Sequence, residues 1–590
     1  MQQSRGATTC GVSRRGVVAS GISIAGSVAL GRVAAQTPTA GPQASPVASP
    51  VASPVLNHPL DIVHAGELPE DGQPVRGGTL RLPVHPVGLT NLVLPLHGQD
   101  PQVAWSYLDA LVRIDRETGL PAPSLARAWT WSEDGHTLSF ELRDDVRWHD
   151  GRPFTAEDVR FSHIVYRDDF RSIFAAQTAL VDDVVVVDDI VVEVRFAEPD
   201  GAWLFNVASL PILPAHQYRE AWEANPVGER TLEGVSFGDE LLVGTGPWVI
   251  ESISASGVAF SRNEDYFAGP PHADRLELLA VERMDERVAL WREGDLHAVG
   301  HLDPQRVEGL LDDEGRLVVA DSPRSLFAAL NFNNPDRVNP TVLVDMALRD
   351  AINLAIDRER YAEEIWNGFL RHERPGLIML PWVETGDEKN SSRNLARARK
   401  VLEEAGFGDY NGDGVLDSPA GDALVLTTIV QDTVEPAVVD TLEAMDADLC
   451  EIGIALSIEV LPPEAFVARW SVDRTWDLIV YDLVLYPAFA SFDLVGSAWD
   501  IAANAAGWNP GGYWNPAVDE ALAAYFAAVD EEEMADALAD LQQGLIDDPF
   551  AIWLGQPQTL TLLAPGVRGF TPNPLWLTLD TRLMWLAEDE

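Results

Sequence analysis

The sequence predicts an α/β protein that folds into more than one lobe. Its 590 residues are more than a single hydrophobic core usually serves, and hydrophobic residues make up 46% of them. Short apolar segments with the period of β-strands alternate along the chain with longer segments of helical spacing. That alternation is typical of α/β folds.

Residues 1–35 have the pattern of an export signal. Arg14 and Arg15 precede a mildly apolar run of small residues, and Val33-Ala34-Ala35 forms a cleavage site. The paired arginines resemble a twin-arginine signal, but the next positions do not complete that pattern, so the general secretory route stays open. We expect an exported protein, periplasmic or extracellular, that is soluble once the signal is removed.

Residues 36–75 are expected to form a disordered linker. Ala-Ser-Pro-Val occurs three times between Ala44 and Val55, and such low-complexity segments form extended tethers. The folded body should therefore begin near Arg76.

The net charge bears on the class of ligand, and the cysteine content bears on disulfide bonding. The formal net charge is −51 at pH 7, and a surface that acidic repels the phosphates of nucleic acids. The charge therefore argues against nucleic-acid binding. Cys10 lies in the predicted signal, which leaves Cys450 as an expected unpaired core residue of the exported chain.

The first half of the body is expected to be rich in strands. In chain order we expect a strand over 77–82, a helix over 104–114, a strand over 136–143, a helix from 155 to 165, and hairpins over 184–196 and 248–262. Thr155 and Asp158 form a capping box at the start of the second helix.

The second half alternates helices with short strands. Helices are expected over 344–366, 395–405, 518–528 and 532–546, and strands over 326–332, 424–430, 455–460 and 478–483. Gly406 is a natural left-handed cap for the helix that ends at Ala405.

Several blocks of sequence resemble one known family. The longest covers 108–159, and Gly244-Thr245-Gly246-Pro247-Trp248 is the next. Further blocks cover 262–267, 348–357, 398–407 and 513–519. They resemble the extracellular solute-binding proteins of family 5, the dipeptide, oligopeptide and nickel receptors of ABC importers. The blocks run in family order from about residue 76 to the end of the chain, which makes the resemblance specific.

The resemblance implies a two-lobed, periplasmic-binding-protein-like fold with an extra small domain inserted in the first lobe. Lobe one would comprise 76–105, 240–325 and 556–590, the inserted domain 106–239, and lobe two 326–555. Chain crossings near Ser325 and Gly555 would form the hinge between the lobes.

The function implied is that of a monomeric receptor that closes two lobes around a peptide-like ligand and delivers it to the membrane permease of an ABC importer. Such a receptor performs no chemistry and requires no cofactor. An oligosaccharide or a metal chelate is an alternative ligand. An exported glycosidase is a rival class, because it needs only two carboxylates about 5–10 Å apart and the chain has 92 acidic residues.

The resemblance also points to ligand-binding residues. Relatives hold the ligand's ammonium with a carboxylate that follows a strand resembling 477–481. Here Tyr486 stands about where that aspartate is expected, and Asp482 and Asp493 are the nearest substitutes; a surface carboxylate is the other interpretation of Asp482. The predicted set is Trp105, Asn333, Tyr481, Asp482, Tyr486, Asp493 and Trp508.

One loop matches the first half of a calcium-binding loop. Asp409, Asn411, Asp413 and Asp417 place oxygen-bearing side chains at alternate positions around two glycines. The closing glutamate is missing, because Ala420 stands at the twelfth position. A structural calcium ion and a plain Asx-rich turn are the two alternatives.

Overall fold

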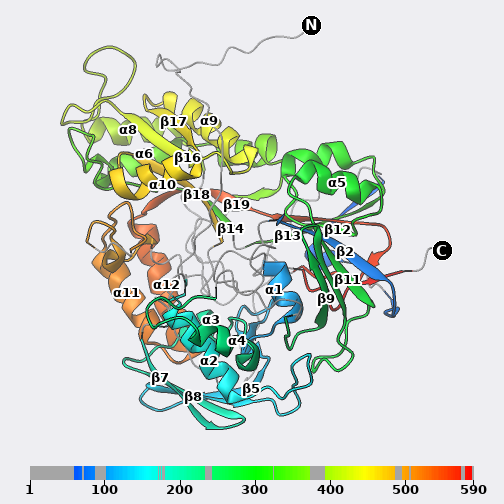
Figure 1. Cartoon of the computed structure of the whole chain (residues 1–590). Helices are drawn as coiled ribbons and strands as arrows, with labels where there is room; N and C mark the ends of the chain where they lie inside the picture. The colour runs from blue at the N-terminus through cyan, green and yellow to red at the C-terminus, as the bar shows by residue number, and fades with distance from the viewer. Residues whose placement is uncertain are drawn as a thin grey trace. The chain divides into compact units, whose positions relative to one another are not determined.

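The computed structural model describes residues 59–68, 72–86, 101–169, 172, 174–175, 178, 180–232, 242–322, 324–372, 392–484, 494–503, 507–572 and 579–587. The described residues belong to two compact units (Figure 1). The N-terminal unit draws on 31–320, 526–533 and 559–590, and the C-terminal unit on 321–525 and 534–558.

The C-terminal unit is built on a mixed six-stranded sheet with the order β15-β19-β14-β18-β16-β17. β14 pairs antiparallel with β18 and β19, whereas β16 pairs parallel with β17 and β18. The strands are β14 (Arg324–Leu330), β15 (Leu370–Arg371), β16 (Val425–Gln431), β17 (Ala455–Leu461), β18 (Leu478–Val484) and β19 (Ala551–Pro557). β14 is buried along almost its whole length, as expected for a central strand covered on both faces.

Helices follow or connect these strands. They are α6 (Met346–Ala355), α7 (Arg358–Arg360), α8 (Leu395–Glu404), α9 (Pro436–Cys450), α10 (Pro463–Val467), α11 (Pro516–Ala527) and α12 (Glu531–Asp547). Short 3-10 or π segments lie at Val342–Val344, Tyr361–Ile365, Ala468–Asp473 and Ser497–Trp499.

The N-terminal unit contains three four-stranded sheets, β1-β13-β20-β12, β2-β11-β10-β9 and β5-β6-β8-β7, and the strand pairs β3-β4 and β21-β22. Its strands are β1 (Leu60–His64), β2 (Thr79–Val84), β3 (Val112–Ile114), β4 (Pro121–Pro123), β5 (Ala126–Trp131), β6 (Thr137–Leu142), β7 (Val181–Asp188), β8 (Val191–Phe196), β9 (Trp248–Ser254), β10 (Gly257–Arg262), β11 (Arg275–Ala280), β12 (Ala298–Val299), β13 (Gly315–Ala320), β20 (Thr559–Leu563), β21 (Val567–Arg568) and β22 (Trp585–Leu586). Its helices are α1 (Pro101–Tyr107), α2 (Ala156–Asp168), α3 (Trp203–Asn206), α4 (Ala215–Glu223) and α5 (Met284–Arg292), with 3-10 turns at Ala65–Glu67 and Pro304–Leu310.

One hydrophobic cluster joins the sheets β2-β11-β10-β9 and β5-β6-β8-β7. Leu80 and Trp248 of the first sheet belong to the same cluster as Phe140 of the second. The second sheet lies within 106–239, the range expected to be a separate inserted domain. That insertion stays a prediction.

Several local predictions are confirmed. Both halves of the capping box are present at α2, where the Thr155 amide donates to Asp158 Oδ2 at 2.9 Å. The two predicted hairpins appear as β7-β8 and β9-β10. Gly406 follows α8 with a φ of 85°, in the left-handed region that a helix cap of this kind uses.

Two predicted helices are wrong in their extent. The helix expected over 104–114 ends at Tyr107, because the Tyr107 carbonyl accepts the Gly246 amide at 2.9 Å instead of an amide of the next helical turn. The helix expected over 344–366 breaks at Ile356, whose backbone is extended. There the Asp357 side chain caps α7 by accepting the Arg360 amide at 3.2 Å.

Two further expectations need correction. The linker expected over 36–75 extends too far, because Leu60–His64 forms β1 and pairs in parallel with β13; residues 1–58 lie outside the described residues. Cys450 is half-buried, not a core residue, and is disulfide-bonded in the full chain; its pairing in the exported chain, which lacks the predicted signal, stays a prediction. Among the described residues, no helix is long and apolar enough to cross a membrane.

Candidate functional site

Three neighbouring strands of the C-terminal unit place a row of aromatic side chains on one face of the sheet. Phe327 of β14 pairs with Tyr481 of β18 on one side and with Trp553 of β19 on the other. The ring centroids of Phe327 and Tyr481 lie 5.6 Å apart, and those of Phe327 and Trp553 lie 6.0 Å apart with an interplanar angle of 5°. We call this row, with the tryptophans described next, the aromatic face.

Two tryptophans extend the aromatic face beyond the strands. Trp470, in the π segment after α10, and Trp508 are half-buried, and their ring centroids are 5.1 Å apart. Burial raises the pKa of Tyr481, and the Trp470 indole partly offsets this rise by approaching the hydroxyl without the geometry of a full hydrogen bond. Tyr481 and Trp508, two of the residues predicted from the sequence, are thus brought together through Trp470.

Asp482 points to the opposite face of the same sheet, because neighbouring residues of a strand alternate sides. The Arg324 guanidinium binds both oxygens of the Asp482 carboxylate. Its Nε lies 3.1 Å from Oδ1, and its Nη2 contacts Oδ2. Arg324 also reaches Glu435 at 3.2 Å. Burial alone would lower the pKa of Arg324, but these two carboxylates raise it.

This ion pair separates Asp482 from the aromatic face. The Asp482 side chain is only 12% exposed and that of Arg324 only 13%, so Asp482 is not an isolated surface carboxylate. A ligand ammonium at Asp482 would have to share or displace Arg324. The structure therefore does not bring Tyr481 and Asp482 together on one surface.

The other predicted residues lie apart or outside the described chain. Asn333 is exposed in the turn after β14, where its amide donates to Asn331 Oδ1 at 3.0 Å. Trp105 is half-buried in α1 of the N-terminal unit. Tyr486 and Asp493 lie outside the described residues.

Sequence reasoning missed Trp470 and Trp553. A lone tryptophan is more often a core residue than a ligand contact, so composition could not single them out. The only available signal was the strand pattern over 551–557, which places Trp553 on one face of β19. Its neighbours Phe327 and Tyr481 are far away in sequence, and only the strand pairing joins them.

The predicted calcium loop is held together by its own backbone amides. Asp409 Oδ1 accepts the Gly412 amide at 2.7 Å, and its Oδ2 accepts the Gly414 amide at 3.0 Å. Asp413 and Asp417 accept the amides of Val415 and Tyr410. No group of three or more His, Cys, Asp or Glu side chains arranged to hold a metal ion occurs among the described residues. Calcium binding stays a prediction.

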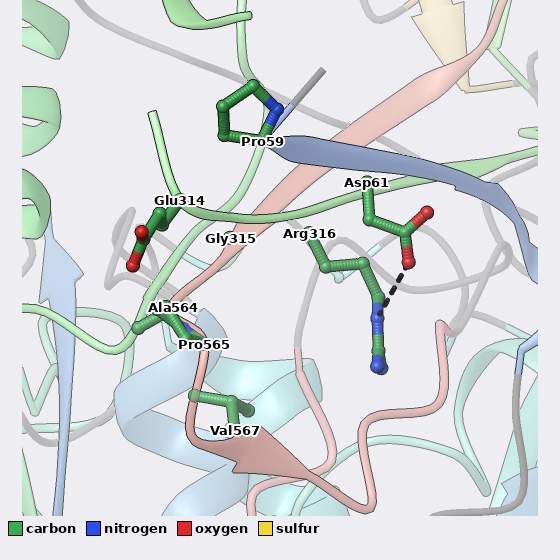
Figure 2. A pocket seen from close by; sticks show the side chains of 8 residues that line it. All are labelled: Pro59, Asp61, Glu314, Gly315, Arg316, Ala564, Pro565 and Val567. Carbon is green, nitrogen blue, oxygen red and sulfur yellow. Dashed lines mark ion pairs between the residues drawn. The ribbon is translucent and has the colours of Figure 1, made fainter. Parts of the chain in front are cut away.

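A hollow of about 250 Å³ lies beside β1 in the N-terminal unit (Figure 2). An ion pair between Asp61 and Arg316, at 3.9 Å, stands on one side of it. The hollow contains none of the residues predicted to bind a ligand. Because the two atoms are 3.9 Å apart and the Asp61 side chain is 65% exposed, this pair adds little binding energy.

Three of the sequence blocks meet at one buried carboxylate. Asp109, from the first block, accepts the Thr245 hydroxyl at 2.9 Å and the Tyr266 hydroxyl at 2.8 Å. Thr245 belongs to the Gly-Thr-Gly-Pro-Trp block and Tyr266 to the block over 262–267. Burial raises the pKa of Asp109 to about 6, although the two hydroxyls and Arg582 act to lower it.

A family model described as bacterial extracellular solute-binding proteins, family 5, matches residues 121–495. The chain belongs to this family. Protein XP55 of Streptomyces lividans is 27% identical over 492 residues, which cover 81% of this chain and 83% of that protein. The probable di/tripeptide-binding protein 5 of Pseudomonas aeruginosa is 24% identical over 79% of this chain and 88% of its own.

The fold is shared with solved members of the family. The oligopeptide-binding protein AppA from Bacillus subtilis, solved with a nonapeptide, superposes with a TM-score of 0.66 at 20% identity and covers 88% of this chain and 100% of its own. The likeness confirms the predicted fold class, the two-lobed fold of periplasmic binding proteins.

Proposed function

We propose that this family 5 protein is the extracytoplasmic receptor of an ABC importer and binds a peptide-like ligand by closing its two lobes. The observation that carries the proposal is the family match over 121–495, together with relatives whose names describe peptide binding. The partner implied is a membrane permease, and the receptor acts as a monomer without catalysis.

The aromatic face suits such a ligand. Flat rings of Tyr481, Trp470 and Trp508 offer apolar walls with polar edges, a combination that accepts varied side chains beside a peptide backbone. Lobe closure couples ligand binding to recognition by the permease. The ligand binds the closed state more tightly than the open state and therefore stabilises it. The permease then distinguishes loaded from empty receptor by shape.

Asp482 has two competing roles within this proposal. As the anchor for a ligand ammonium it would be released from Arg324 when ligand binds. As a structural group it stays paired with Arg324, which is itself shared with Glu435. The geometry of the ion pair favours the structural role.

The variant Asp482→Ala separates these roles. If Asp482 is structural, its loss leaves Arg324 buried with one partner fewer, so stability should fall by about 3 kcal/mol while ligand affinity changes less than about twofold. If Asp482 anchors an ammonium, affinity should fall by about 2–5 kcal/mol, or roughly 30-fold or more. Denaturation and calorimetry on the same preparation measure the two quantities.

The function itself is tested on ligand-free mature protein offered a pool of di- to nonapeptides. Binding should lower the radius of gyration in solution scattering, and mass spectrometry should recover the bound peptide intact. An unchanged radius at full occupancy would reject lobe closure. Steady cleavage of the peptides, or of glycans offered in parallel, would instead identify an enzyme.

A further inference from the structure

Five buried polar atoms on or beside the aromatic face make no hydrogen bond of full geometry, although two of them, the Trp470 indole and the Tyr481 hydroxyl, approach each other. They are Ser325 Oγ, Trp470 Nε1, Tyr481 Oη, Trp553 Nε1 and Gln556 Nε2. Ser325 is 0% exposed, Gln556 6% and Trp553 8%. Buried polar groups are nearly always paired in folded proteins, so five such atoms within one region call for an explanation.

The strand register places three of these atoms, those of Ser325, Tyr481 and Trp553, on one face. Ser325 precedes Phe327 by two residues in β14 and therefore shares its face, on which Tyr481 and Trp553 flank Phe327. Gln556 lies further along β19, beyond Gly555. In the order of the sheet, β14 lies between β18 and β19.

All five atoms can donate a hydrogen bond, and three can only donate. The two indole nitrogens and the amide nitrogen of Gln556 have no acceptor capacity, whereas the two hydroxyls can do either. A ligand ammonium is also a pure donor, so it would leave both indoles and the amide unsatisfied. A carboxylate accepts about four hydrogen bonds through its two oxygens and fits this set.

The charges nearby are consistent with a carboxylate. Asp482, whose negative charge would repel a carboxylate, lies on the opposite face of the sheet and is neutralised by Arg324. Hydrogen bonds to an ionised acceptor are about twice as strong as neutral ones, so uncharged donors suffice to hold it.

From these contacts we infer that the aromatic face binds a carboxylate of the ligand and, in a peptide, its C-terminal carboxylate. The inference rests on the proposed function. It reverses the orientation of the peptide that the sequence predicts, because this strand region would hold the C-terminal carboxylate of the peptide and not its N-terminal ammonium. Trp553 and Tyr481 supply the central donors.

The test uses three versions of one tripeptide pool: free acid, C-terminal amide and N-acetylated acid. The wild-type protein should bind the free and N-acetylated acids with similar affinity and the amide about 10- to 100-fold more weakly. A side-chain carboxylate as the bound group would appear as amide binding confined to peptides that contain Asp or Glu, and would overturn the C-terminal assignment.

Two conservative variants locate the effect. Trp553→Phe and Tyr481→Phe each remove one donor and keep a ring, so each should weaken acid binding about 10-fold and leave amide binding nearly unchanged. Because the Tyr481 hydroxyl makes no hydrogen bond of full geometry, its removal should change the melting temperature of the ligand-free protein little. Trp291→Phe is the matched control, since Trp291 is a buried tryptophan of the N-terminal unit with an unpaired indole nitrogen.

The outcomes separate this inference from the function on which it rests. Equal binding of acid and amide by the wild type, or equal losses for both forms in Trp553→Phe, would overturn the carboxylate assignment and leave a peptide receptor standing. Failure of the wild type to bind all three pools and also the pool of di- to nonapeptides would overturn the proposed function and the inference together.

Discussion

Asp109 is a buried carboxylate whose ionisation opposes folding. Its raised pKa of about 6 means that the folded state holds the proton more tightly than the unfolded chain does. The stabilising contribution is therefore present below about pH 4, the pKa of an unfolded aspartate, and is lost as the pH rises to about 6.

Replacing Asp109 with Asn should flatten this pH dependence. A shift of about two pKa units corresponds to about 3 kcal/mol, so the free energy of unfolding of the variant relative to wild type should rise by up to that amount between pH 4 and 7. Chemical denaturation at four pH values measures it. Asp265→Asn removes an exposed charge from the loop of Tyr266 as the control, and parallel curves for Asp109→Asn and wild type would contradict the assignment.

At the residue scale, the sequence identified residues of the candidate site better than it identified the residues that they contact. Tyr481 and Trp508 were selected from the strand region and do lie near each other, through Trp470. The pairing of Asp482 with Arg324 could not be predicted, because 158 positions separate the two residues in sequence. Only the antiparallel register of β14 and β18 brings their side chains together.

At the element scale, hydrophobic period and capping signals placed the strands that were predicted, but strands such as β1, β11 and β13 and helices such as α4 and α5 were not predicted. These signals also failed where a tertiary hydrogen bond ends an element, as at Tyr107. Gly244, in the block from Gly244 to Trp248, lies close to Tyr107, where the predicted helix ends early. A Cβ on Gly244 would lie 1.6 Å from the Tyr107 carbonyl oxygen, so only glycine allows the two segments to approach.

Gly244→Ala should therefore be severely destabilising. The clash is with backbone and cannot be relieved by a side-chain rotation, so we expect a loss of about 4 kcal/mol or more, or failure to fold. Gly300→Ala is the matched control in the same unit, because its Cβ would meet nothing within 4 Å. Thermal melts of both variants would test this, and similar melting temperatures would show that the segments can separate cheaply.

The loop over 409–417 gives a second prediction at this scale. If it binds calcium, millimolar calcium should raise the melting temperature above that in chelator, and the increase should grow with calcium concentration because only the folded state binds. Asp413→Ala should abolish the increase, while Asp432→Ala, outside the loop, should retain it. Identical melting in calcium and chelator would leave the Asx turn, whose amide contacts already satisfy the carboxylates.

At the scale of the whole molecule, ordered blocks made the family and the fold class predictable. Asp109, Thr245 and Tyr266 link three of these blocks in space, since each supplies one part of a single buried network. The start of the folded body was harder to place. β1 is a short strand whose apolar pattern over 60–64 becomes meaningful only when β13, more than 250 residues later, pairs with it.

The last prediction concerns the export of the whole chain. Cleavage after Ala35 should give a mature protein that begins at Gln36, which N-terminal sequencing of secreted protein can establish. Replacing Arg14 and Arg15 with Lys keeps the positive charge but removes the twin-arginine pair, so it should block export only if that route is used. Because β1 begins at Leu60 and pairs with β13, deleting 36–56 from the mature protein should leave its melting temperature unchanged, whereas extending the deletion through His64 should lower it. A mature protein that retains residues 13–30 would contradict the predicted signal.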